Sequence, residues 1–279
     1  MTDTELIELN KRGFIALDDE SEDSFLFRVR HSLNLSEAFT SHASLKEKLK
    51  RGINEVTNLY DIAPDWVPLY FDNKSLPFWQ GGCAWIFQTE KEGPLSAVIQ
   101  LRKAFHNKNR YFGLKTDEII AHELCHVARL NFEEPKYEEF FAYETSNSSF
   151  RKKYGPLFQS SYESLLFVFL LLIPLFIDFY FILEGVQLSF IQSIFPKLIP
   201  LFYLFYLGYR LVQKRKTFER TKEKLNKYGN NGNFILFRLK DKEIDDFSKM
   251  SLTQIENYLI EGAKSSLRLK QLVLSYLGN

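Results

Sequence analysis

Residues 165–183 read LLFVFLLLIPLFIDFYFIL, 19 positions in which Asp178 is the one charged residue. A helix of about 20 mainly apolar residues is long enough to cross the ~30 Å hydrocarbon core of a bilayer. The alternative is a buried hairpin in a soluble core, but a helix that packs with one face does not need so many apolar residues. The stretch therefore predicts a membrane-spanning helix, with soluble parts before and after it in the chain.

A second apolar segment, Val186–Tyr209, follows after a short connection. It contains one charge, Lys197, and two prolines, which membrane helices tolerate better than soluble helices do. We expect a second span, and a re-entrant or interfacial segment is the alternative. Asp178 lies late in the first segment and Lys197 early in the second, so the two side chains either pair at a similar depth or each extend to the interface.

The charges that flank this hairpin indicate its orientation. Arg151, Lys152 and Lys153 precede it, and residues 210–227 after it contain eight Lys or Arg against two Glu. The connection between the two segments has no Lys or Arg before Lys197. Because Lys and Arg are enriched in cytoplasmic loops, the sequence predicts a multi-pass membrane protein with two spans, surrounded by membrane lipid, with both soluble parts on the cytoplasmic side.

The average composition of the whole chain does not reveal this division into an apolar hairpin and soluble parts. The 279 residues carry 36 Lys and Arg against 35 Asp and Glu, and this net charge of +1 argues against a nucleic-acid partner. The mean hydropathy of −0.22 is typical of a soluble protein, yet 10 of the 27 Phe lie within residues 158–206. Two cysteines are too few for a disulfide scaffold.

Periodicity and turn signals predict the elements outside the hairpin. Residues 1–60 have mainly helical patterns. Strand patterns separated by turn signals occupy residues 66–71, 83–88 and 96–105. A helix is expected at Asp117–Arg129 with Thr116 as its N-cap, and another from about Lys136. Beyond the hairpin we expect a basic helix at 217–227, a strand at Phe234–Leu239 and a helical region at 253–276.

The predicted helix at Asp117–Arg129 contains the chemical motif of the chain. Its residues His122-Glu123-Leu124-Cys125-His126 form the pattern HExxH. Residues four apart share one helical face, so both imidazoles can bind a single Zn²⁺ ion. Glu123 can then serve as general base toward a zinc-activated water. The alternative is a pair of structural histidines on an amphipathic helix.

A catalytic zinc ion needs a third protein ligand. The chain has five histidines and none follows His126, so a downstream carboxylate is the expected ligand. A helical hairpin that folds back at about residue 133 brings residues near 140 level with His126. Glu138, Glu139 and Glu144 are then all within reach of the ion.

The motif and the residues after it resemble the gluzincin metallopeptidases. His122–His126 followed by Glu139-Phe140-Phe141-Ala142 is similar to the zinc helix and the second, Glu-bearing helix of membrane-bound members such as the CaaX prenyl protease and heat-shock membrane protease types. The resemblance covers roughly residues 95–150. It implies Glu139 as the third zinc ligand, with Glu138 and Glu144 as alternatives. Tyr143 stands where the family usually has the Asp that orients a ligand histidine.

The resemblance also implies further roles. Residues 96–105, with Val98 and Gln100, would form the edge strand that pairs with an extended peptide substrate. Tyr143 or Glu144 would replace the missing Asp. A hydrogen-bond donor besides zinc would stabilise the transition state, and the candidates are Tyr143, His106, Tyr111, Tyr137 and Arg110.

These observations predict an α+β protein in four parts. They are an N-terminal helical region (1–60), a zincin-like core with a small mixed or antiparallel sheet (61–157), a transmembrane hairpin (158–212) and a C-terminal cytoplasmic α/β region (213–279). The expected function is a membrane-anchored zinc metallopeptidase acting on a peptide or protein. The alternatives are a non-catalytic membrane adaptor with a decayed zincin domain and a zinc hydrolase of a non-peptide amide.

Overall fold

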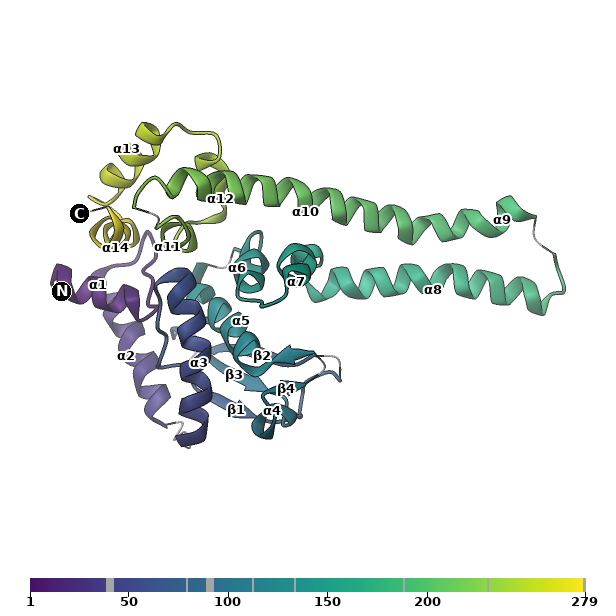
Figure 1. Cartoon of the computed structure of the whole chain (residues 1–279), viewed down its shortest axis with the longest axis horizontal. Coiled ribbons are helices and arrows are strands. Elements are labelled where there is room, and N and C mark those ends of the chain that lie inside the picture. The colour runs from purple at the N-terminus through teal and green to yellow at the C-terminus, as the bar shows by residue number, and fades with distance from the viewer. Residues whose placement is uncertain are drawn as a thin grey trace.

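A long helical hairpin projects from a body of shorter helices and a small sheet (Figure 1). The computed structural model describes residues 1–38, 43–78, 80–88, 93–111, 113–132, 134–187, 189–229 and 231–277. The architecture is mostly helical α+β, in agreement with the expected class.

The hairpin consists of α8 (Ser161–Leu183), the short α9 (Phe190–Ile194), a 3-10 turn (Phe195–Lys197) and α10 (Leu198–Leu225). Both arms are long and apolar enough to cross a membrane, and few of their apolar residues are buried against the protein itself. The prediction of two such segments is confirmed at this level. Asp178 and Lys197 form an ion pair with 2.9 Å between Oδ2 and Nζ, so the paired alternative holds for these two side chains.

The N-terminal region is helical, as predicted. It contains α1 (Asp3–Lys11), α2 (Glu22–Ala38) and α3 (Ala43–Tyr60). Thr2 caps α1 through a capping box with Glu5, which satisfies two backbone donors at the start of the helix. The buried side of α3 packs along α5 (Thr116–Arg129), the helix that contains the HExxH motif.

The main sheet has three strands in the order β1-β3-β2. β1 (Leu69–Phe71) runs parallel to β3 (Leu95–Leu101), and β2 (Gly82–Gln88) runs antiparallel to β3. A short helix α4 (Ala104–Asn107) and a small hairpin of β4 (Arg110–Tyr111) and β5 (Leu114–Lys115) lead into α5. The predicted strand at 96–105 therefore ends four residues early.

The central strand of this sheet corrects the predicted substrate strand. β3 lies between β1 and β2, so Val98 and Gln100 cannot pair with a substrate. Both side chains are buried. The order of strands depends on pairings between distant residues, which an alternating sequence pattern does not encode. Within the described residues, the strand with an open edge toward α5 is β2.

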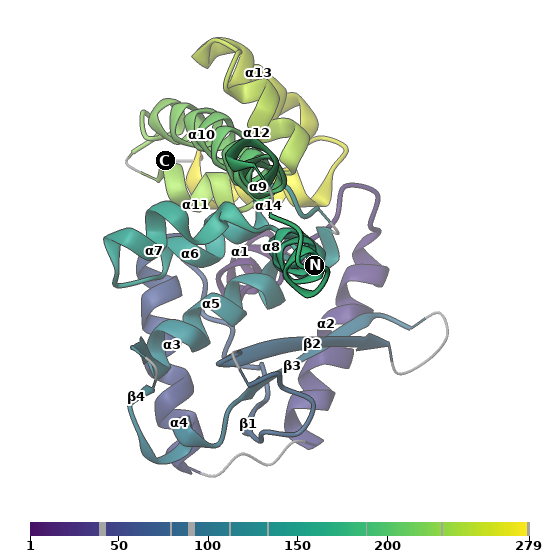
Figure 2. The same cartoon turned by 90° about the vertical axis from the view of Figure 1, so that its right-hand side faces the viewer.

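Helix α5 lies between the three-stranded sheet and α6 (Glu138–Glu144), as Figure 2 shows. A 3-10 turn (Leu130–Phe132) follows α5, and α7 (Ser149–Tyr154) and a 3-10 turn (Gly155–Leu157) connect α6 to the hairpin. The predicted N-cap at Thr116 is wrong by one residue, because Lys115 occupies the N-cap position. The Thr116 hydroxyl instead donates to the Lys108 carbonyl.

The C-terminal region is helical throughout its described part, with α11 (Gly232–Phe237), α12 (Asp241–Phe247), α13 (Leu252–Gly262) and α14 (Leu267–Tyr276). The predicted strand at Phe234–Leu239 and the α/β character of this region are therefore wrong. A short apolar run does not distinguish a buried strand from a buried helix. Phe237 stacks on Tyr60 at 4.4 Å and meets Phe141 edge-on, so this helix completes the core beneath α3 and α6.

Candidate metal centre

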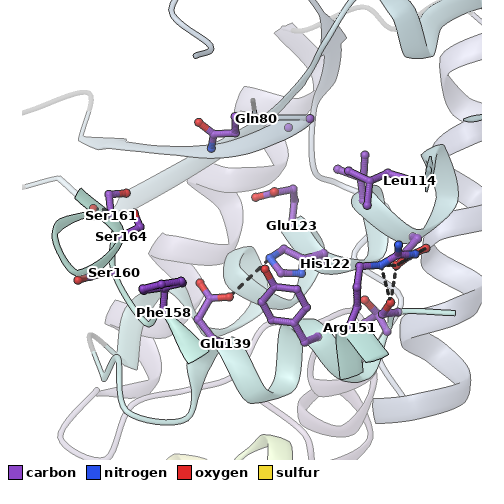
Figure 3. Close-up of a pocket in the computed structure, with 17 residues that line it drawn as sticks. Gln80, Leu114, His122, Glu123, Glu139, Arg151, Phe158, Ser160, Ser161 and Ser164 are labelled. Atoms are coloured by element: carbon purple, nitrogen blue, oxygen red, sulfur yellow. Dashed lines mark hydrogen bonds and ion pairs between the residues drawn. The ribbon is translucent and has the colours of Figure 1, made fainter. Parts of the chain in front are cut away.

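Three side chains from α5 and α6 converge on one point. The ligand atoms of His122, His126 and Glu139 all lie within 4.8 Å of one another. The two Nε2 atoms of the histidines are 3.3 Å apart. The Glu139 carboxylate lies 3.8 Å from His122 Nε2 and 3.9 Å from His126 Nε2. Figure 3 shows His122, Glu123 and Glu139 directed into the same cavity.

These distances suit a tetrahedral zinc ion. Ligand atoms at ~2.0–2.1 Å from Zn²⁺ are about 3.3 Å apart in a tetrahedron. The two nitrogens already have this separation, whereas the Glu139 carboxylate, which faces one nitrogen with each of its oxygens, needs to move closer to them. Two imidazoles and one carboxylate are also a donor set found in catalytic zinc sites, where the fourth position stays open. The residues present therefore fit a zinc ion.

Glu138 contacts the far side of the His126 ring and lies outside the group formed by His122, His126 and Glu139. Its carboxylate lies 3.0 Å from His126 Nδ1, and this contact directs Nε2 toward His122 and Glu139. Its other oxygen faces the buried Arg129 at 3.7 Å. Adjacent residues on a helix point about 100° apart, so Glu138 and Glu139 cannot both face the same point. Glu144, the other alternative, pairs with Arg215 on α10 instead.

The two histidines have opposite protonation tendencies. Burial and the neighbouring His126 lower the pKa of His122 to about 3, although its hydrogen bond to the Ala142 carbonyl opposes this. Burial also opposes the charge of His126. However, the hydrogen bond to Glu138 and the charges of Glu139, Glu138 and Glu123 outweigh it and raise the pKa of His126 to about 9. Metal binding here would therefore release a proton from His126.

Glu123 is held by the backbone of β2. Its Oε2 accepts a hydrogen bond of 2.8 Å from the Ala84 N–H. Burial raises the pKa of Glu123, and the charge of Glu139 adds to this effect, while His126 and the Ala84 N–H oppose it. Gly82 permits this close approach, because a Cβ there would lie 2.9 Å from the Ile119 side chain on α5 and 2.5 Å from Leu101.

Tyr143 lies beside the cluster. Its ring packs edge-on against His122, with 4.9 Å between centroids. Burial and the charges of Glu139 and Glu123 raise the pKa of its hydroxyl to about 12, so the phenol remains a donor at neutral pH. Tyr143 does not take the place of the missing Asp, because Glu138 orients His126 and the Ala142 carbonyl orients His122.

His106 lies away from the cluster and this part of the prediction is wrong. It contacts Asn107 and packs edge-on against Phe71 in the region of α4. Tyr111, Tyr137 and Arg110 likewise do not line the cavities at the cluster, whereas Tyr143 does. Residues 106–111 are close to the motif in sequence, but the β4–β5 hairpin turns the chain between them and α5.

Two cavities meet at the cluster and share Gln80, His122, Glu123 and Glu139. One, of about 480 Å³, extends past Tyr143 and Ser146 to Phe158 and the first turn of α8. The other, of about 510 Å³, extends along Cys83, Ala84 and Ile86 of β2 toward Pro135. The free edge of β2 therefore borders a continuous path across the candidate metal site.

Sequence reasoning missed several of these contacts. The Ala84 N–H has no side-chain signal, and its position depends on how β2 packs on α5. Gln80 borders both cavities from a loop. Glu138 is excluded from the side of α6 that faces both histidine Nε2 atoms only once Glu139 is known to lie there, because adjacent residues on a helix point in different directions.

Comparison of the chain with protein-family models, curated proteins and solved structures finds no match. By its structure, the chain is a mostly helical α+β protein with two apolar helices long enough to cross a membrane. A His-His-Glu group that could hold a metal ion lies in its soluble body.

Proposed function

We propose that this chain is a membrane-anchored zinc metallopeptidase of gluzincin type. The convergence of His122, His126 and Glu139 within 4.8 Å, beside a buried Glu123 and at the junction of two cavities, carries the proposal. A zinc ion bound by these three residues would lower the pKa of a water molecule and polarise a peptide carbonyl.

The residues of the chain would act around that centre. Glu123 would accept the proton of the attacking water and pass it to the leaving amine. Its raised pKa suits this role, because a general base works best with a pKa near the operating pH. The Tyr143 hydroxyl, which lines the same cavity, is the candidate donor to the developing oxyanion.

The peptide would lie along β2 in this proposal. Extended peptides bind open sheet edges through backbone hydrogen bonds. The edge of β2 borders one cavity, and its Ala84 N–H already contacts Glu123. β2 thus takes the role that the sequence assigned to residues 96–105.

The hairpin would place this site at a membrane. The positive-inside rule favours a cytoplasmic position for the soluble body, because Arg151–Lys153 and the basic part of α10 lie on the same side of both spans. A protease accessibility assay on sealed vesicles would test this orientation.

The central test compares wild-type protein with Glu123→Gln. We expect about one zinc ion per chain in both, since Glu123 is not a ligand, and a loss of casein cleavage by a factor of 10² or more in the variant. Glu139→Ala, which removes a proposed ligand, should lose zinc in addition to activity. Normal cleavage by Glu123→Gln would refute the mechanism. A wild-type chain that binds no zinc would favour the adaptor, and zinc without peptide cleavage would favour an amidase.

A further inference from the structure

Helix α7 presents two exposed aromatic rings beside the base of the hairpin. Phe150 is 70% exposed and Tyr154 is 44% exposed. They are four residues apart on one helical face, and their rings are in contact at a tilt of 46°, with 5.0 Å between centroids. Neither ring packs into the hydrophobic core. An exposed apolar pair is available to contact a partner outside the chain, and its surroundings indicate which partner fits.

The orientation of α7 suits a membrane surface. Figure 1 shows α7 nearly end-on beside the start of α8, and Figure 2, seen along the hairpin, shows it lengthwise. α7 therefore runs across the direction of the two apolar arms and not along it. A bilayer crossed by these arms would lie parallel to α7, and interfacial helices lie in this way.

Contacts on two sides fix α7 in this position. Its Arg151 pairs with Glu118 on α5 at 2.8 Å. Two carbonyls in its last turn, those of Lys152 and Lys153, accept hydrogen bonds from Arg215 on α10 at 2.6 and 3.1 Å. The helix is thus joined to both the metal helix and the hairpin, so its height relative to the membrane is set by the hairpin.

Residues at the base of the hairpin indicate where the surface of a bilayer would lie. Glu163 on α8 pairs with Arg210 on α10, so the residues next to them lie at a similar level. These neighbours include the exposed Tyr162 and Tyr209. Tyrosines are enriched at the membrane–water interface, and these two lie near the base of the hairpin, one on each arm.

The charges around the aromatic pair are positive. Lys152 and Lys153 lie between Phe150 and Tyr154 in sequence, and Lys153 Nζ is 5.2 Å from the centre of the Tyr154 ring. Lysines around an apolar interfacial face attract the anionic lipids of a cytoplasmic leaflet.

We propose that α7 is an interfacial helix that holds the soluble body against an anionic lipid surface, with Phe150 and Tyr154 at the headgroup level. This contact between α7 and the lipid is called the interfacial seat. The seat is independent of the proposed peptidase chemistry. Through Arg151 and Glu118, it would hold α5 at a fixed distance from the bilayer.

Single tryptophan substitutions in the full chain test this proposal. Phe150→Trp is the probe, Phe169→Trp on α8 reports insertion of the hairpin, and Phe27→Trp on the distant α2 is an exposed control. Each protein is reconstituted in vesicles of phosphatidylcholine alone or an equal mixture with phosphatidylglycerol, with brominated lipids as quenchers. The signal is the difference from the unsubstituted chain.

We expect quenching of Trp at position 150 in the mixed vesicles to exceed that at position 27 by about threefold or more, and to fall in phosphatidylcholine alone. Lys153→Gln in the Phe150→Trp background should reduce the difference between the two lipids. Equal quenching at positions 150 and 27 would overturn the interfacial seat. Equal quenching at position 150 in both lipids would overturn its anionic preference, and no quenching at position 169 would overturn the seat together with the hairpin.

Discussion

Glu138 and Glu139 are neighbours in sequence but face different groups in the site. Glu139 faces both Nε2 atoms, whereas Glu138 contacts Nδ1 of His126 and lies near Arg129. The HExxH spacing was enough to predict that His122 and His126 face one point, because helix geometry places residues four apart on the same side. The choice among Glu138, Glu139 and Glu144 could not be made from spacing alone, since it depends on the rotation of α6 about its axis.

Glu138→Gln tests the orienting role at this scale. Gln keeps the size of the side chain but removes the charge, so His126 becomes a weaker ligand and zinc affinity should fall about tenfold. A chelator competition titration measures this. Glu144→Gln is the matched control on the same helix and should leave zinc affinity unchanged, because Glu144 pairs with Arg215. The same loss in both variants would contradict the assignment.

Asp241 provides a pH prediction at a distance from the metal ligands. Burial raises its pKa from 3.8 to about 6, although Lys136 N–H and Arg129 favour the charged form. The folded state then keeps a proton that the unfolded state releases, so this group's contribution to stability is full below pH ~4 and is lost as the pH rises to ~6. The loss is at most about 3 kcal/mol.

Asp241→Asn should remove that part of the pH dependence. Urea unfolding followed by tryptophan fluorescence at several pH values between ~4 and ~7 would measure it. We expect the wild type to lose stability relative to the variant across this range. Parallel curves for the two proteins would show that the carboxyl does not titrate in this way.

At the scale of elements, local patterns predicted more than pairings between distant elements. Helix α5 and the apolar arm α8 were found within a few residues, because periodicity and length identify them. The role of β3 and the strand at Phe234–Leu239 were wrong, because strand order and the choice between buried helix and strand depend on contacts with the rest of the fold. The position of β2 beside the candidate metal site could therefore not be predicted from the sequence.

Ala84→Pro tests the contact between β2 and α5. Proline removes the N–H that holds Glu123, and an edge strand tolerates it because that N–H is not needed for the ladder. We expect casein cleavage to fall about tenfold while zinc content stays the same, since a misplaced general base loses part of its contribution. Ala84→Gly retains the N–H and is the control. Full activity in Ala84→Pro would show that the contact has no catalytic role.

At the scale of the molecule, the base of the hairpin and the candidate metal site border the same cavity. The near-zero net charge combines basic segments at the base of the hairpin with acidic side chains elsewhere. The cavity that begins at His122 and Glu123 reaches Ser160, Ser161 and Ser164 at the start of α8. A substrate in that cavity would thus lie against the start of α8, which is long and apolar enough to cross a membrane.

Ser164→Trp tests this connection between the hairpin and the site. A large ring at this position would fill the end of the cavity, so we expect casein cleavage to fall by about tenfold or more while zinc content is unchanged. Val168→Trp is the matched control, because Val168 lies about one turn further along α8, is exposed and does not line the cavity. Unchanged cleavage in Ser164→Trp, with zinc bound, would mean that substrates occupy only the cavity along β2. Equal losses in both variants would instead indicate that the ring disturbs the hairpin.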